Sequence, residues 1–171
     1  MNKIIHLLIP LLFVSSYALD IGTVPSHIVL DKDNGGSANG SAWDSHSLKG
    51  KVHTLLYMDP DKRDESQILL DALSKLKVDN KAYSTVAIIN LAATWMPNSI
   101  LQSKLREKQK ELNNMEYVFD KTKFLVKKWH LKDDASNVVI LDKNSKVIYQ
   151  KSGKLSPKDV QKILQIISKT I

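Results

Sequence analysis

No cysteine occurs anywhere in the 171 residues of this chain. That absence excludes a disulfide scaffold. It also excludes thiol–disulfide exchange and thiol peroxidase chemistry, because both reactions need a sulfur nucleophile. Zinc sites built on thiolates are excluded for the same reason. The only sulfur in the chain is that of four methionine thioethers.

The chain also lacks a segment in which charges of one sign are concentrated. Lys and Arg number 25 against 18 Asp and Glu, which gives a formal net charge of +7. Basic and acidic residues interleave, however, in segments such as KLREKQKELNN and SPKDVQK. Interleaving of this kind is typical of a solvated surface rather than of a nucleic-acid-binding face. We therefore expect no nucleic-acid partner.

The longest apolar run lies at the N-terminus. Lys3 precedes an apolar stretch over residues 4–14, and Ser16 and Ala18 then place small residues where a signal peptidase requires them. The stretch is too short to span a bilayer comfortably. The pattern predicts that residues 1–18 are a cleaved secretory signal and that residues 19–171 form a single domain in the periplasm, without stable membrane insertion. The alternative is an uncleaved N-terminal anchor.

Hydrophobic periodicity in the rest of the chain predicts strands that alternate with helices. Strands are expected at 26–31, 51–58, 83–92 and 115–119, a β-hairpin over 137–153, helices around 69–76, over 97–114, within 123–131 and over 156–171, and a loop or hairpin over the Gly- and Ser-rich segment 32–50. In the helix over 97–114 we expect Ile100, Leu101 and Leu105 on the buried side. The last helix should begin with a capping box of Ser156 and Asp159, and Ile171 should end its buried stripe. This order predicts an α/β fold with a mixed central sheet and helices on both faces.

The second half of the chain also carries a resemblance. The segments AYSTVAIINLAATW and YVFDKTKFLVKKWHLKDDASNVVILDKNSKVIYQKSGKLSPKDVQKIL resemble the YtfJ family of exported bacterial proteins. The resemblance covers roughly residues 20–170. It implies a thioredoxin-like three-layer sandwich with an N-terminal β extension, and a family whose biochemical role is undefined.

The resemblance implies that this chain differs from redox-active thioredoxins at two positions. The position of the CxxC motif falls on the turn from Met58 to Arg63, and the position of the cis-proline falls on or near Ser136. A residue other than proline at that position is expected to have a trans peptide bond. Both halves of the redox site are therefore missing.

The turn that replaces the CxxC motif is the main candidate site. Asp59, Asp61, Lys62 and Arg63 follow a buried strand and precede a helix. Ligands of α/β sheets bind at such junctions, where backbone N–H groups and the helix dipole favour an anion. We predict a ligand-binding site formed by these four residues and Ser136. The alternative is purely structural, with Asp61 or Asp64 capping the helix and Pro60 shaping the turn.

The other candidates favour structural roles. No two of His27, His46, His53 and His130 have the spacing of a metal motif, so no metal site is predicted. The glycine-rich segment lacks the pattern of a phosphate-binding loop, and no cofactor is predicted. Trp95 and Trp129 are expected to pack in the core, and the alternative is that either lines a ligand pocket.

Taken together, the sequence favours a non-catalytic, thioredoxin-like module that binds a partner protein or a small anionic ligand in the periplasm. No catalytic residue is predicted. The alternative, which the sequence leaves open, is an enzyme that uses the turn from Asp59 to Arg63 for cysteine-independent chemistry. A deep pocket with perturbed titratable groups would favour the enzyme, and a shallow turn whose carboxylates serve as caps would favour the binding module.

Overall fold

A computed structural model of the chain describes residues 19–111 and 114–171. The predicted signal segment, residues 1–18, lies outside the described residues. The helices are α1 (Gln67–Ser74), α2 (Asn98–Lys110), α3 (Phe124–Trp129) and α4 (Pro157–Thr170), with 3₁₀ segments η1 (Ser45–Leu48) and η2 (Pro60–Glu65). The strands are β1 (Val29–Leu30), β2 (Gly35–Ser37), β3 (Trp43–Asp44), β4 (Val52–Met58), β5 (Tyr83–Asn90), β6 (Met115–Asp120), β7 (Asn137–Leu141) and β8 (Val147–Ser152).

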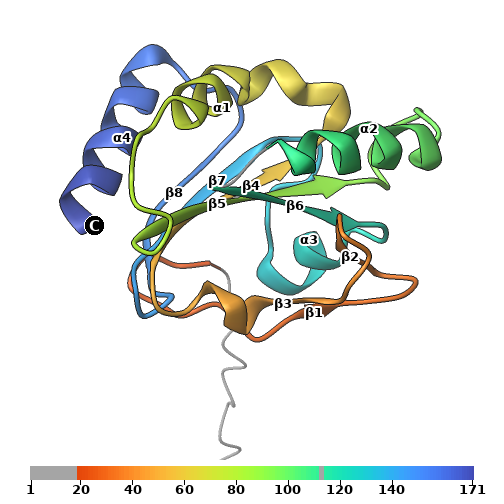
Figure 1. Cartoon of the computed structure of the whole chain (residues 1–171), viewed down its shortest axis with the longest axis horizontal. Helices are drawn as coiled ribbons and strands as arrows, with labels where there is room; N and C mark the ends of the chain where they lie inside the picture. The colour runs from red at the N-terminus through yellow and green to blue at the C-terminus, as the bar shows by residue number, and fades with distance from the viewer. Residues whose placement is uncertain (1–18, 112–113) are drawn as a thin grey trace, which may run out of the picture.

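Six strands form one mixed sheet in the order β2-β6-β5-β4-β7-β8. β4 pairs in parallel with β5, and β5 with β6, whereas β7, β8 and β2 join antiparallel. β1 and β3 make a separate two-stranded ladder. Helices α1, α2 and α4 lie on one face of the sheet, and α3 and the β1–β3 ladder lie on the other (Figure 1). The fold is therefore the three-layer α/β sandwich that the sequence predicts.

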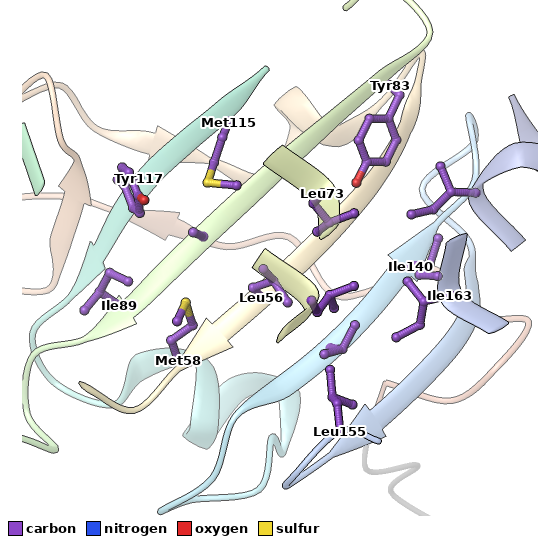
Figure 2. Packing of buried hydrophobic residues seen from close by; sticks show 14 of the residues in the cluster. Leu56, Met58, Leu73, Tyr83, Ile89, Met115, Tyr117, Ile140, Leu155 and Ile163 are labelled. Atoms are coloured by element: carbon purple, nitrogen blue, oxygen red, sulfur yellow. The ribbon is translucent and has the colours of Figure 1, made fainter. Parts of the chain in front are cut away.

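Each face of the sheet has its own hydrophobic core. Along β4, Leu56 and Met58 enter the core under α1 and α4, while Leu55 and Tyr57 enter the core over α3. The first core also takes side chains from the neighbouring strands and from both helices (Figure 2). Because successive side chains of a strand point to opposite faces, a strand buried on both faces reads as continuously apolar. The interpretation of the stretch from 51 to 58 is confirmed.

Near the start of two helices, a carboxylate from a residue close in sequence accepts backbone N–H groups. Ser156 and Asp159 form the expected capping box at the start of α4, with each side chain accepting a backbone N–H of the other residue. At α3, the fully buried carboxylate of Asp120 accepts the N–H groups of Phe124 at 2.8 Å and Leu125 at 2.9 Å. The same carboxylate accepts the Thr122 N–H at 3.1 Å and the Tyr57 hydroxyl at 3.1 Å. Asp120 thus ties β4 to the β6–α3 junction.

Several sequence predictions need correction. The segment 32–50, expected to be a loop or hairpin, contains two short strands that join different sheets: Gly35–Ser37 pairs with β6 and forms an edge of the main sheet, and Trp43–Asp44 pairs with β1. Ile100 is 49% exposed and Ile171 is 37% exposed, so neither lies in the buried stripe of its helix. α2 contacts the core through one narrow side, which carries the partly buried Leu101 and Leu105. Within residues 19–111 and 114–171, none of the helices has the length and apolar character that crossing a bilayer requires.

Candidate functional site

The predicted turn lies at the carboxyl end of two parallel strands. β4 ends at Met58, which pairs with Ile89 of β5, so the segments that leave these strands emerge side by side. η2 follows β4, and a loop over residues 91–97 follows β5. The Thr94 hydroxyl of that loop donates a hydrogen bond to the Asp61 carboxylate at 2.8 Å. One continuous edge, which we call the turn edge (residues 59–71 and 91–100), therefore combines both segments.

Asp59, rather than Asp61 or Asp64, is the cap of this turn. Its Oδ1 accepts the backbone N–H of Asp61 at 2.8 Å, and Pro60 occupies the first turn of η2. α1 starts only after η2, at Gln67, and the side chain of its N-cap residue, Ser66, makes no capping bond. Only 3% of Asp59 is exposed, and burial raises the pKa of its carboxyl above the ordinary value. Desolvation disfavours the charged form, which explains that direction.

Lys62 and Arg63 are exposed, as the anion-site hypothesis requires. Lys62 departs from helical geometry, with φ −113° and ψ 27°. The Arg63 Nε donates to Gln67 Oε1 at 2.9 Å, and the Gln67 amide donates to Asp71 at 2.7 Å. The guanidinium is thus partly held along the surface of α1.

Ser136 adjoins the end of the turn but does not face solvent. It is 1% exposed, and its hydroxyl lies 3.2 Å from that of Ser66. Its N–H donates to Glu65 Oε2 at 2.8 Å, and its carbonyl accepts from the Gly153 N–H at 2.8 Å. Tertiary structure therefore brings Ser136 beside the turn across 70 residues of sequence, with both backbone groups already bonded. Every described peptide bond, including that of Ser136, is trans.

A depression of about 730 Å³ lies on the turn edge. It is broad and open, and its walls come from η2 and α1: Pro60, Asp61, Arg63, Asp64, Gln67, Ile68 and Asp71. Three of these side chains are carboxylates and one is a guanidinium. The wall charge is therefore not that of an anion pocket.

Trp95 is the feature of this edge that the sequence prediction missed. It was expected in the core, but 85% of its surface is exposed, whereas Trp129 is 1% exposed and its indole N–H donates to the Ser26 carbonyl at 2.9 Å. Ile68 and Ile100, both on the turn edge, are also exposed, by 39% and 49%. The available signal was the position of Trp95 in the segment TWMP, between a strand and a helix and outside either periodic pattern.

Comparison with solved structures defines the class of the fold. A peroxiredoxin-like protein from Aquifex aeolicus matches with a TM-score of 0.64 at 12% identity, over 90% of this chain and 89% of that one. The thioredoxin domain of a thiol-disulfide oxidoreductase from Bacteroides vulgatus matches with a TM-score of 0.60 at 15% identity, over 87% of this chain and 98% of that one. The protein is thus a thioredoxin-like α/β sandwich, and it has this fold without any cysteine.

Sequence comparison places the chain more closely. Residues 25–170 match the family model described as a bacterial protein of unknown function, YtfJ_HI0045. The uncharacterized protein YtfJ of Escherichia coli is 28% identical over 148 residues, covering 84% of this chain and 78% of the relative. An uncharacterized protein of Haemophilus influenzae is 26% identical over 129 residues, covering 74% of this chain and 70% of the relative. The chain belongs to the YtfJ family.

Proposed function

We propose that this chain is an exported, non-redox binding module that docks a partner protein on its turn edge. The observation that carries the proposal is the 85% exposure of Trp95 beside the turn. Large aromatic side chains are the residues that most often anchor protein interfaces. Thr94, the neighbour of Trp95, is bonded to Asp61, so the loop and the turn form one surface.

The shape and charge of the turn edge favour a protein over a small anion. Pockets for small ligands are concave and bury most of the ligand surface, whereas this depression is open. Three carboxylates against one guanidinium would repel an anion from the depression. Exposed Trp95, Ile68 and Ile100 among mixed charges instead resemble the composition of a protein-binding patch.

The enzyme alternative has less support. Asp59 has a raised pKa, but one of its oxygens is used to cap η2. Asp61 accepts a hydrogen bond from Thr94 and lines an open surface. A carboxylate that serves as a cap, beside an open surface, favours a binding module over an enzyme. Export is supported by the apolar stretch and small residues over 1–18.

Photo-cross-linking in living cells tests the docking surface. A photoreactive phenylalanine analogue at position 95 should give a discrete adduct with one partner protein. The same analogue at Lys146, in the turn between β7 and β8 at the opposite end of β4, serves as the control. An absence of adducts at position 95, or the same adducts from both positions, would overturn the proposal.

Matched charge variants then separate the two kinds of ligand. Lys62→Ala/Arg63→Ala should weaken the adduct, whereas Lys143→Ala/Lys146→Ala, with the same loss of charge, should not. Thermal stability should barely change, because exposed substitutions usually cost within about 0.5 kcal/mol. Phosphate-induced NMR shifts confined to the turn and lost in the first variant would favour a small anion instead.

A further inference from the structure

A group of metal-ligating side chains lies at the other end of β4, away from the turn edge. It consists of His27, Asp44 and His46, and each residue offers one ligand atom within 4.8 Å of the others. His27 precedes β1, Asp44 ends β3, and His46 lies in η1. Segments that are well separated in sequence thus meet through the β1–β3 ladder.

Backbone bonds hold these segments in fixed register. Val29 pairs with Asp44 in the ladder. The Ser45 N–H donates to the Ile28 carbonyl at 2.9 Å, and the Ile28 N–H donates to the Ser45 hydroxyl at 2.9 Å. Ser45 is buried, so this connection is shielded from water. The backbone segments that carry the three side chains are therefore held in place relative to each other, which reduces the entropy cost of binding an ion.

The two imidazoles converge on one carboxylate oxygen. His27 Nε2 lies 2.9 Å from Asp44 Oδ1, and His46 Nδ1 lies 3.6 Å from the same atom. A tetrahedral ion with bonds of about 2.0–2.1 Å separates its donor atoms by about 3.4 Å. The two distances from the carboxylate oxygen lie on either side of that value.

The orientation and chemistry of the three groups also suit a cation. The Asp44 carboxylate accepts the His46 backbone N–H at 2.8 Å, which helps to hold its orientation. The imidazole rings are stacked, with centroids 3.8 Å apart and planes inclined by 6°. Neutral imidazole is the form in which histidine binds metals.

A hollow of about 120 Å³ adjoins the group. Both imidazoles line it, together with Leu48, Lys49 and the Ser145 side chain among others. The Ser145 hydroxyl is buried and has no hydrogen-bond partner among the described residues. Buried polar groups are normally bonded to protein or to water. The charge of Lys49 opposes a cation here, and the ionised Asp44 offsets it.

We propose that His27, Asp44 and His46 form a binding site for a first-row divalent transition-metal ion, with Zn²⁺ as the ion that this donor set suits. Two imidazoles and one carboxylate are a ligand set that zinc accepts, and water completes the coordination. Such a water on the side of the hollow would give the Ser145 hydroxyl a partner. The site is independent of the turn edge and of the partner proposed there.

Isothermal titration with Zn²⁺ tests the site on the purified chain, without an affinity tag and after treatment with a chelator. The wild type should bind one saturating equivalent. His27→Ala and His46→Ala should each weaken binding by about 10- to 100-fold or more, since even the loss of an outer-sphere partner has effects of that size. His130→Asn is the matched control, because it removes another exposed imidazole at a left-handed position that Asn tolerates.

Asp44→Asn separates the metal role of this residue from its structural role. Asn caps as well as Asp, so the N–H of His46 keeps its acceptor and the stability of the metal-free chain should stay close to wild type. Zinc affinity should nevertheless fall, and zinc should raise the melting temperature of the wild type more than that of the variant. The proposal is overturned if the wild type binds no zinc, if both alanine variants bind as the wild type does, or if His130→Asn weakens binding equally.

Discussion

Acidification should destabilise this protein through His53, a buried histidine on the central strand. His53 lies on β4 between Ser84 of β5 and Leu141 of β7, and 3% of it is exposed. Burial lowers its pKa from 6.5 to about 4. A hydrogen bond between its Nδ1 and the Lys51 carbonyl, at 3.1 Å, acts in the opposite direction but is the smaller effect. The imidazole is therefore neutral in the folded protein at neutral pH.

The sign and size of the effect follow from proton linkage. Below its ordinary pKa of 6.5 the unfolded chain binds a proton on His53, whereas the folded chain binds it only near pH 4. The contribution of neutral His53 to the free energy of unfolding is thus fully present above pH 6.5 and is lost as the pH falls toward 4. That interval corresponds to about 3 kcal/mol of unfolding free energy, a large part of the ~5–15 kcal/mol typical of a domain.

Urea unfolding followed by circular dichroism measures this loss, with His53→Phe as the comparison because its ring does not titrate. Between about pH 7 and 4.5 the wild type should lose about 2.5 kcal/mol more than the variant. Asp59 has the opposite effect, because burial raises its pKa. As the pH falls, the folded chain binds a proton on Asp59 before the unfolded chain does, so acidification stabilises the fold through this residue. That contribution is common to both proteins and cancels. Parallel pH profiles, or an NMR titration of His53 with a midpoint near 6.5 in the folded protein, would refute the reasoning.

Three further predictions concern stability, export and chemistry. Asp120→Ala should lower the free energy of unfolding in urea by about 3 kcal/mol or more, because four donors lose a buried carboxylate. Tyr57→Phe should lower it by only about 1 kcal/mol, because the backbone donors to Asp120 stay paired. Equal losses in the two variants would contradict the view that Asp120 stabilises the fold chiefly through these backbone groups. N-terminal sequencing of protein from the periplasmic fraction should begin at Leu19, and an uncleaved chain in the cytoplasm would end the export hypothesis. The purified chain should show no insulin reduction and no thiol-dependent peroxide consumption above a boiled control.

Much of the fold was predictable because its signals are local or periodic. β4 and β5 read as continuous apolar runs, and the capping box of α4 involves residues only three positions apart. The turn at Asp59 was predictable as a strand-to-helix junction. Its cap was assigned wrongly, because a 3₁₀ segment moves the start of α1 to residue 67 and leaves Asp59 as the acceptor.

The candidate sites were less accessible to sequence reasoning. Apolar character alone predicts burial for Trp95, yet the loop after β5 directs this side chain into solvent. No spacing rule connects His27 with Asp44 and His46, because the ladder of β1 and β3 brings them together.

By itself, the sequence determined that thiol chemistry is absent, and it determined the order of the strands and helices from β4 to α4. The lack of cysteine is a property of composition, and periodic burial is repeated along each element, so both are readable without coordinates. Tertiary structure decided which side chains meet and which stay exposed, as in the contact of Ser66 with Ser136 and the grouping of His27 with Asp44. Such contacts depend on strand register and on loop direction between distant segments, and these are set by the packing of the whole sheet.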